Sequence, residues 1–461
     1  MLSRREFLAA GSAAVPFLSW PLGGAQTANF LLGTATSAYQ VEGAIAADGK
    51  GESVWDEFVL RPGAIAGGAS GAKACDFYHQ FQNDIAIMGA MACNAFRFSV
   101  AWTRVLPQGT GAVNQRGLDF YRRLVDALLA AGIEPVLTLF HWDTPVALDR
   151  RGGWRTPEMV EWFGAYAAVV ARALGDRVRW WLTINEPRSF IGGGYVAGVQ
   201  APGLRLERKH ALAAAHHVLL AHGRAVQAIR AEAGRAAKVG IPNDCTPVLP
   251  TAGVEAETAR AATFATPLEN FTARGWWNEN AWWHEPIYRG AYPAAALAAL
   301  GPDAPKIAAG DGAAIAQPLD FLAANVYAGR TLSGAWPART ARTGFGWPVT
   351  PEALYWAPRW LHERYRLPVF VTENGCSEPD GVAPDGAVHD TARQQFTGSY
   401  VAALRRAMAD GTPVLGYLYW SLLDNFEWQA GYTQRFGLVY VDFDSERRVV
   451  KDSGRRFVAI R

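Results

Sequence analysis

Cysteine is scarce in this 461-residue sequence, and its four residues are widely spaced: Cys75, Cys93, Cys245 and Cys376. There is no Cys-x-x-Cys pair and no Cys/His cluster with zinc spacing. We therefore expect neither a disulfide scaffold nor a structural zinc site. His216, His217 and His222 share an Ala-rich segment, but no His-Glu-x-x-His motif accompanies them. Structural roles are expected for these histidines, and no metal.

An excess of charge of one sign is also absent. The 44 Lys and Arg residues nearly balance the 42 Asp and Glu residues, which leaves a net charge of +2, and no Lys/Arg-rich block stands out. This balance argues against nucleic acid or an anionic membrane as the main partner. Linkers, low-complexity tracts and obvious internal repeats are missing too, so a single domain is the simplest interpretation.

The N-terminal segment resembles a twin-arginine signal peptide. Arg4 and Arg5 are followed by a Phe-Leu pair, an apolar run that ends near Trp20, and small residues up to Ala25. The run is shorter than the roughly 20 residues that span a bilayer, although an uncleaved anchor or a first helix is the alternative. We expect residues 1–25 to be cleaved and the protein to be exported, either periplasmic or secreted.

From residue 30 onward, apolar β-branched runs alternate with amphipathic helical patterns. Eight strands are expected, at 30–39, 94–102, 135–142, 179–185, 238–243, 320–327, 368–373 and 414–420. Helices are expected at 77–88, 116–131, 157–174, 209–233 and 391–409, several with a glycine as C-cap: Gly89, Gly132 and Gly175. Residues 247–293 are ambiguous, and 328–351 is expected to be a long loop. The alternation predicts an α/β fold, a single (β/α)8 TIM barrel, over residues 26–461.

Two of the expected strands end in a carboxylate. Residues 181–187 end in Asn-Glu-Pro with Glu186, and residues 368–375 end in Glu-Asn-Gly with Glu373. The active site of such a barrel lies at the carboxyl ends of its strands, so both carboxyl groups are expected there. Paired carboxyl groups across a sugar perform glycoside hydrolysis, with either stereochemical outcome open. Taken singly, each glutamate could instead form a structural salt bridge.

The other strand ends are rich in amides, indoles and an imidazole. Such groups bind polyhydroxylated rings, because amides pair with hydroxyls and an indole face stacks on sugar C–H bonds. The candidates are Gln40, Arg97, His141, Trp142, Asn185, Asn325, Tyr327, Trp420, Glu427 and Trp428. Core packing is the alternative for many of the aromatic residues.

Several blocks together resemble glycoside hydrolase family one, the retaining β-glucosidase family. They are Ile-Asn-Glu-Pro at 184–187, Val-Thr-Glu-Asn-Gly at 371–375, Ser-Leu-Leu-Asp-Asn-Phe-Glu-Trp at 421–428 and Arg-Phe-Gly-Leu-Val at 435–439. Further matches stand at 33–43, 96–99 and 139–143, in the family's order. The resemblance implies a retaining exo-β-glucosidase without a cofactor, acting on a small β-glycoside or oligosaccharide.

The resemblance also assigns roles to residues. Glu186 would be the general acid/base and Glu373 the nucleophile that forms a covalent glycosyl-enzyme. Arg97 and Tyr327 would lie beside the nucleophile, and Asn185 would hold the 2-hydroxyl. The remaining expected sugar contacts are Gln40, His141, Trp142, Trp420, Glu427 and Trp428, with Asn325 in support.

Three positions depart from the family's usual pattern: Gln200, Val326 and Cys376. They leave the aglycone preference open, and Cys376 could be a reactive thiol or an inert loop cysteine. Glu427 favours substrates without a phosphate, because a carboxylate repels one. Glucose, fucose and galactose remain alternatives for the sugar. A transglycosylase with the same site, or a non-catalytic sugar-binding protein of the cell envelope, are the alternative functions.

Overall fold

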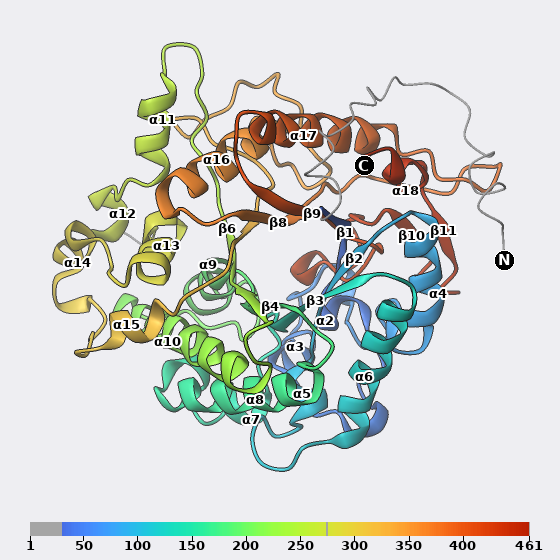
Figure 1. Cartoon of the computed structure of the whole chain (residues 1–461), viewed down its shortest axis with the longest axis horizontal. Coiled ribbons are helices and arrows are strands. Elements are labelled where there is room, and N and C mark those ends of the chain that lie inside the picture. Colours follow the sequence, from blue (N-terminus) through green and yellow to red (C-terminus); the bar gives the residue numbers. More distant parts are fainter. Residues whose placement is uncertain (1–29, 273–274, 461) are drawn as a thin grey trace.

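The computed structural model describes residues 30–272 and 275–460. Its strands lie at the centre, and helices surround them (Figure 1). The strands are β1 Leu31–Ala35, β2 Ala95–Ser99, β3 Glu134–Phe140, β4 Trp180–Ile184, β5 Lys238–Gly240, β6 Pro242–Asp244, β7 Leu322–Asn325, β8 Val369–Asn374 and β9 Val414–Trp420. The expected signal peptide lies outside the described residues. Within them, no helix is long and apolar enough to cross a membrane.

The strands are all parallel and form one sheet in the order β5-β4-β3-β2-β1-β9-β8-β7-β6. β5 and β6 follow each other in the chain, with only Ile241 between them, and stand at the two ends of this order. The backbone N–H of Glu186, just after β4, donates to the carbonyl of Pro242 in β6 at 2.8 Å. The sheet therefore closes into an eight-stranded barrel whose fifth strand is interrupted, which confirms the predicted TIM barrel.

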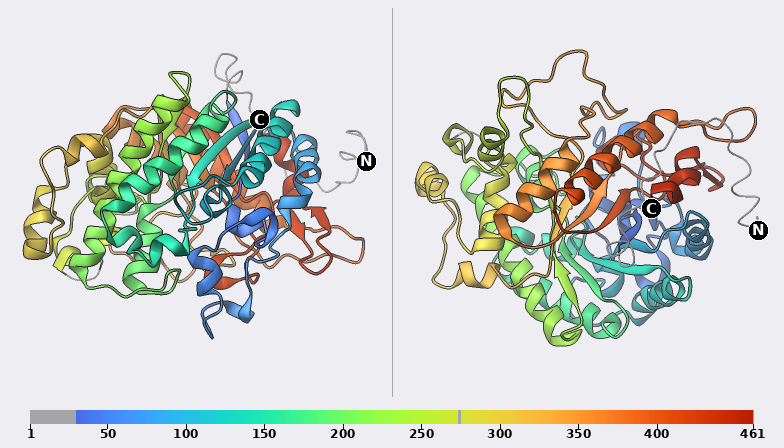
Figure 2. Two further views of the ribbon diagram at one scale, coloured as in Figure 1. Left: turned by 90° about the horizontal axis from the view of Figure 1, so that it is seen from below. Right: turned by 45° about the horizontal axis from the view of Figure 1, so that its top comes forward.

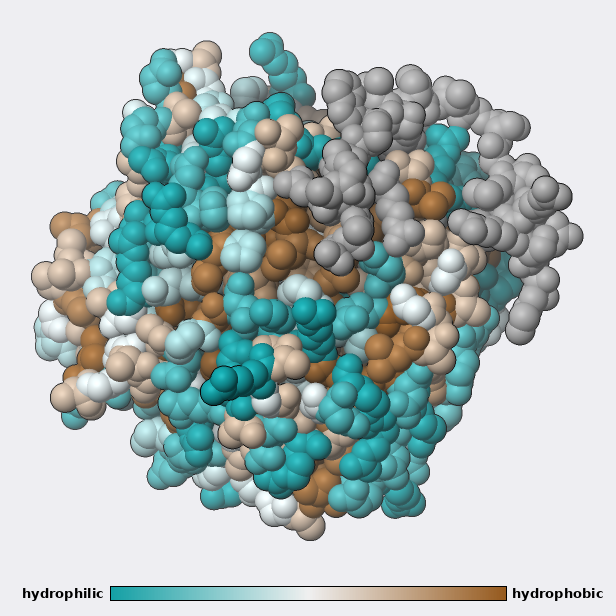
Figure 3. Space-filling view, viewed as in Figure 1, coloured by the Kyte–Doolittle hydropathy of each residue, from teal (hydrophilic) through white to brown (hydrophobic). Residues whose placement is uncertain are grey.

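Helices pack around the barrel (Figure 2). The longer ones are α4 Phe77–Ala90, α6 Gln115–Ala130, α8 Glu158–Leu174, α10 Arg208–Glu232, α13 Asn280–Arg289, α16 Ala353–Tyr365 and α17 Thr391–Ala409. In α6, apolar side chains at helical spacing, including Leu118, Leu124 and Leu128, are buried. This face packs on the outside of the barrel. The side of the molecule shown in Figure 3 is largely hydrophilic, with smaller apolar patches.

Shorter elements occupy the loops between strands and helices. They are α2 Ala38–Val41, α3 Val54–Phe58, α5 Trp102–Val105, α7 Val146–Asp149, α9 Pro187–Ile191, a π-helix Gly192–Ala197, α11 Ala256–Thr263, α12 Leu268–Thr272, α14 Ala294–Leu300, α15 Asp311–Ile315, α18 Asp452–Arg456 and the hairpin β10 Val439–Val441 with β11 Arg448–Val450. The described residues of the ambiguous segment 247–293 thus include the α-helices α11, α12 and α13 and a 3-10 turn at Trp276–Asn278. Residues 328–351 form no helix and no strand of the sheet, as predicted.

Some predicted boundaries were wrong. The first strand ends at Ala35 and a short helix follows it, instead of continuing to residue 39. The fifth strand breaks in two because Pro242 lacks an N–H for the ladder. Gly89 lies inside α4 rather than capping it, and Gly175 caps α8 with an ordinary right-handed φ of −68°. Gly132, one residue beyond the C-cap of α6, has the left-handed φ of +71° that a C-cap glycine requires.

The barrel interior changes from apolar to polar along the strands. An apolar cluster fills it, with Ala95 from β2, Val136 from β3 and Phe370 from β8 among its members. Two residues further along, on the same face, β2 presents Arg97 and β3 presents Thr138, and the Arg97 Nε donates to Thr138 Oγ1 at 3.0 Å. Polar side chains therefore gather at the carboxyl ends of the strands.

Candidate active site

A pocket of about 190 Å³ opens at the carboxyl ends of the strands. It is lined by His141, Trp142, Asn185, Glu186, Ser189, Gln200, Tyr327, Phe345, Trp347, Glu373, Trp420, Glu427, Trp428, Gln429 and Phe436. Nine of the predicted site residues are thus brought together here. The other three, Gln40, Arg97 and Asn325, are buried behind this lining and contact it by hydrogen bonds.

Both carboxylate oxygens of Glu373, in β8, have a donor. Arg97 is fully buried and forms an ion pair with Oε1, and the Tyr327 hydroxyl donates to Oε2 at 2.7 Å. Burial, together with the neighbouring Glu373 and Glu186, holds the pKa of Tyr327 well above its usual value, so the phenol stays neutral and remains a donor. Two charge-assisted hydrogen bonds suit an anionic carboxylate that points into the pocket.

Glu186 has a different environment. It precedes α9 with a left-handed φ of +42°, and its Oε1 accepts from the Asn325 amide at 2.8 Å. Burial, followed by the nearby carboxylates of Asp244 and Glu373, raises the pKa of Glu186 well above its usual range. The two glutamates of the pocket therefore differ: one is set between strong donors, and the other is held as a proton carrier.

Asn185 connects both glutamates. Its Oδ1 accepts from Arg97 Nη2 at 2.6 Å and from the Asn325 amide at 3.2 Å. Its Nδ2 lies 3.1 Å from Nε2 of His141. Because the amide donates here, the imidazole accepts through Nε2 and carries its proton on Nδ1, for which the described part of the chain offers no partner. Burial, and to a lesser degree Arg97, lowers the pKa of His141 well below its usual value, so this histidine is a neutral donor.

Glu427 lies in the loop after β9, on the side of the pocket next to Gln40. The Gln40 amide donates to the Phe426 carbonyl at 2.9 Å, to Asn425 Oδ1 at 3.1 Å and to Glu427 Oε2 at 3.3 Å. Burial, and then the charge of Glu373, raises the pKa of Glu427 to about 8. Gln40 thus acts on the pocket by holding the loop that carries Glu427.

Aromatic rings form two walls. The ring of Trp420 stacks on that of His141, with the ring centroids 5.7 Å apart. The ring centroids of Trp428 and Trp142 are 4.6 Å apart. On the other wall, Trp347 lies 5.1 Å from Tyr327 and 5.9 Å from Phe436. The second wall was not predicted, because Phe345 and Trp347 belong to the long loop 328–351 and Phe436 lies beyond the recognised strand ends.

The pairing of two amides in the pocket was also not predicted, although Gln200 departs from the family's usual pattern. Gln200, which follows the π-helix after β4, donates through Nε2 to Oε1 of Gln429 at 3.1 Å. Both side chains line the pocket together with Ser189. The pair joins the loop after β4 to the loop after β9.

Cys376 is fully buried three residues beyond Glu373. Burial raises the pKa of its thiol to about 12. The thiol is therefore protonated at neutral pH and inert, the second of the two predicted alternatives. Among the described residues, no group of three or more His, Cys, Asp or Glu side chains could hold a metal ion.

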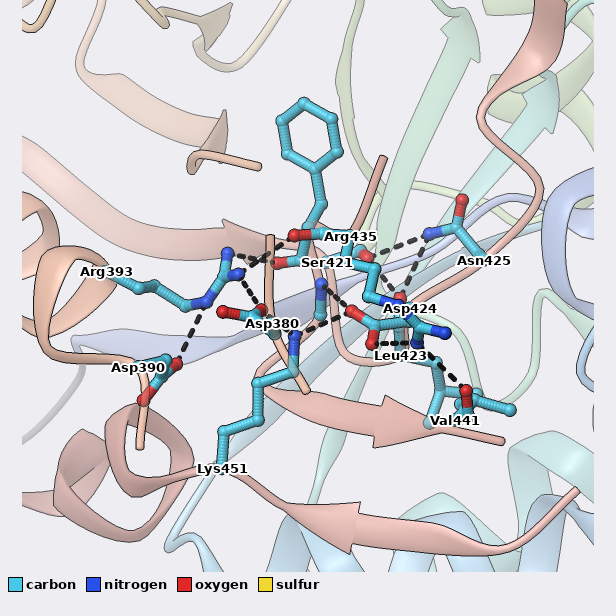
Figure 4. Close-up of polar contacts among 12 residues, drawn as sticks. Asp380, Asp390, Arg393, Ser421, Leu423, Asp424, Asn425, Arg435, Val441 and Lys451 are labelled. Carbon is cyan, nitrogen blue, oxygen red and sulfur yellow. Dashed lines mark hydrogen bonds and ion pairs between the residues drawn. The ribbon is translucent and has the colours of Figure 1, made fainter. Parts of the chain in front are cut away.

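A buried ionic network lies behind the pocket (Figure 4). Lys451 Nζ lies 2.7 Å from Asp424 Oδ1 and also pairs with Asp380. Arg393 pairs with Asp380 and donates to the backbone carbonyls of Cys376 and Phe436. The network contains two further ion pairs, one between Arg393 and Asp390 and one between Arg435 and Asp424.

The network links the loops that carry the site. Cys376 is three residues beyond Glu373, Asp424 is three residues before Glu427, and Phe436 lines the pocket itself. Three acidic and three basic side chains balance, with one ammonium shared between two aspartates. The loops after β8 and β9 are therefore held by charge-assisted bonds from α17 and from the segment before α18.

A buried proton-carrying glutamate beside an ion-paired glutamate, at the carboxyl end of a TIM barrel, places the protein among glycoside hydrolases. The particular family follows from sequence comparison: residues 25–461 match glycosyl hydrolase family 1, and the chain belongs to this family. The predicted family is thereby confirmed.

Several β-glucosidases match this chain over most of their length. β-Glucosidase A of Thermotoga maritima is 40% identical over 435 residues, which cover 92% of this chain and 95% of the relative. A β-glucosidase of an Agrobacterium species is 38% identical over 446 residues, 94% of each chain. The solved structure of a Thermotoga maritima β-glucosidase in complex with noeuromycin has a TM-score of 0.85 at 38% identity, covering 93% of this chain and 97% of that one. The protein is thus an enzyme of the β-glucosidase family.

Proposed function

We propose that the protein is a retaining exo-β-glucosidase that hydrolyses non-phosphorylated β-D-glucosides. The observation that carries this proposal is the contrast between its two pocket glutamates. Glu373 accepts bonds from Arg97 and Tyr327, whereas burial raises the pKa of Glu186. One carboxylate is thus arranged as a nucleophile and the other as a proton donor.

The reaction has two displacements. A carboxylate oxygen of Glu373 attacks the anomeric carbon, the bond to the aglycone oxygen breaks, and Glu186 gives its proton to that oxygen. In the second step Glu186 takes a proton from water, the water oxygen bonds to the anomeric carbon, and the ester to Glu373 breaks. Asn185, fixed by Arg97 and Asn325, is placed to hold the sugar next to Glu373.

The pocket favours a neutral sugar. No Lys or Arg occurs among the described residues that line it, so a sugar phosphate has no counter-charge there. Since Glu427 has a pKa of about 8, the repulsion expected from its charge is reduced near neutral pH, and the lack of a cation is the stronger argument. A relative's structure contains a galacto-hydroximolactam, which keeps β-galactosides, along with β-fucosides, as further substrates to test.

Two variants test the roles. Glu373→Gln should abolish release of nitrophenol from 4-nitrophenyl β-glucoside. Glu186→Ala should lose most activity and recover it with azide, giving a β-glycosyl azide. Full activity in folded Glu373→Gln, or no rescue of Glu186→Ala, would contradict the proposal.

Stereochemistry supplies an independent test. Retention requires the two carboxyl groups to be about 5 to 5.5 Å apart, and the first sugar product to be the β-anomer. Proton NMR at early reaction times distinguishes the anomers. A product that begins as the α-anomer would show inversion and contradict the proposal.

Transglycosylation on the same site is a second candidate. It is favoured by the amide pair Gln200–Gln429 and the Trp347 wall, which line the same pocket as the glutamates and suit the hydroxyls and face of an acceptor sugar. Product analysis with a sugar acceptor in excess decides between the two, since hydrolysis that still dominates would exclude it. The non-catalytic alternative is set aside, because the chain belongs to an enzyme family.

We also propose that the protein is exported through the twin-arginine pathway. The support is the sequence of the first 25 residues, with Arg4 and Arg5 before an apolar run. Mass spectrometry of the protein from its native compartment tests this. An N-terminus at Met1 would contradict cleavage.

A further inference from the structure

A third carboxylate lies behind the acid/base. Asp244 is the last residue of β6, and its Cα is the ladder partner of Asn325 in β7, whose amide donates to Glu186. The backbone of Glu186 is itself bonded to Pro242 of the same strand. β6 therefore brings the Asp244 carboxylate into the neighbourhood of Glu186, with which it interacts electrostatically.

Two residues that follow Glu186 hold this carboxylate in place. The Nε of Arg188 lies 3.0 Å from Asp244 Oδ2, and the Ser189 hydroxyl donates to the same oxygen at 3.4 Å. Ser189 lines the pocket with Glu186, and its backbone N–H donates to the Glu186 carbonyl at 3.0 Å. The side chain of Asp244 is only 18% exposed, so water screens its charge weakly.

We propose that Asp244 is a positioning residue that sets the pH range over which Glu186 holds the proton it donates. The inference rests on the proposed function, because it needs Glu186 as the general acid. Asp244 does not touch the reacting atoms. It acts through its charge, through Ser189 and through its neighbour Asn325 in the ladder.

The electrostatics around Glu186 support this role. Asp244 contributes more to the raised pKa of Glu186 than Glu373 does, and only burial contributes more. The other titratable or charged groups around the two carboxyls are Arg97 from β2, His141 after β3, Arg188 from α9, Cys245 after β6, His284 from α13, Tyr327 after β7, Glu373 from β8 and Glu427 after β9. Burial lowers the pKa of His284 and raises that of Cys245 to about 12, so both are neutral at the pH of the reaction.

The expected change in the pKa of Glu186 has a definite direction. Asp244→Asn removes a negative charge beside Glu186 and leaves the Arg188 cation without its partner carboxylate, and both changes favour ionised Glu186. The pKa of Glu186 should fall, so the alkaline limb of the kcat/KM profile should move to lower pH by about 0.5 to 1 unit. Measured on that limb, kcat/KM should fall about three- to tenfold.

The test uses two leaving groups. With 4-nitrophenyl β-glucoside or a disaccharide, the limb should shift in Asp244→Asn. With 2,4-dinitrophenyl β-glucoside, which leaves with little help from an acid, kcat/KM should change little. Asp244→Glu keeps the charge and should restore the limb. Glu161→Gln, on the outer face of α8 and 69% exposed, removes one surface charge and should not move it.

Arg188→Gln provides a second variant in case Asp244→Asn does not fold. It removes the cation and should move the alkaline limb in the opposite direction, to higher pH. An unshifted limb in folded Asp244→Asn, or in Arg188→Gln where the first variant does not fold, overturns the inference. So does an equal loss with both leaving groups. Failure of the proposed function would look different, because the unaltered protein would then release no nitrophenol at any pH.

Discussion

The phenol oxygen of Tyr327 lies 2.7 Å from Oε2 of Glu373. The other oxygen of this carboxylate is paired with Arg97, so Glu373 is held by one donor from β2 and one from the segment after β7. Tyr327 also packs on Trp347 of the second aromatic wall. Tyr327 thus joins the Glu373 carboxylate to this aromatic wall.

Tyr327→Phe should lower kcat/KM for 4-nitrophenyl β-glucoside by about 10- to 100-fold, because a hydrogen bond to a charged group is lost while the ring remains. The unfolding temperature should change little. Phe345→Leu alters the same wall without touching Glu373, and should lose much less. An unchanged kcat/KM in Tyr327→Phe would show that the Tyr327 hydroxyl does not contribute to catalysis.

The raised pKa of Glu427 predicts a pH-dependent stability. A carboxyl whose pKa rises from 4.5 to about 8 on folding contributes stability below about pH 4.5, and this contribution is lost as the pH rises through about 8. Glu427→Gln cannot ionise. Its free energy of unfolding, relative to the unaltered protein, should therefore increase by more than about 1 kcal/mol between pH 5 and pH 9. Glu207→Gln, 73% exposed, is the control, and an equal pH dependence in both variants would contradict the prediction.

Lys451→Met should destabilise the protein by about 3 kcal/mol, since it leaves Asp380 and Asp424 buried with one cation fewer. Arg393 and Arg435 remain, so the fold should survive. Adding Asp380→Asn should recover part of the loss. Lys209→Met removes a lysine that is 53% exposed and should cost less than about 1 kcal/mol. Urea unfolding of the unaltered protein, Lys451→Met, the double variant with Asp380→Asn, and Lys209→Met measures these differences. Equal losses of unfolding free energy in Lys451→Met and Lys209→Met would be inconsistent with a network.

Gln429→Ala should lower kcat/KM for cellobiose about three- to tenfold, because a hydroxylated aglycone loses an amide partner and Gln200 loses its bond. Hydrolysis of 4-nitrophenyl β-glucoside should be nearly unchanged, since that aglycone offers no hydroxyl. Gln200→Ala should behave alike. Equal losses on both substrates would show that the pair only supports the loops.

Much of the fold and the two candidate catalytic glutamates could be predicted, because both follow from local sequence patterns. Apolar, β-branched runs identified all eight barrel strands, and each catalytic candidate stands at the end of such a run: Glu186 after β4 and Glu373 in β8. Parallel strands bring these ends to one face, so two distant carboxyl groups could be expected in one pocket. The break at Pro242 was missed, although a proline inside a predicted strand is itself a signal for it.

The second aromatic wall, the Gln200–Gln429 pair and Asp244 could not be predicted in this way. Phe345, Trp347 and Phe436 come from loops, whose course depends on tertiary packing and leaves no periodic trace. The Gln200–Gln429 pair joins segments 229 positions apart. Asp244 was not predicted as a site residue, because the predicted strand ended one residue before it. Its proposed effect on Glu186 depends on its spatial neighbours rather than on a sequence motif.

Lys451 lies downstream of every residue that lines the pocket, yet its ammonium joins the loops after β8 and β9. A chain that ends before this lysine would contain every strand of the barrel and both glutamates, but Asp380 and Asp424 would lack their shared cation. The arrangement of the pocket loops should therefore depend on a C-terminal segment that contributes no side chain to the pocket.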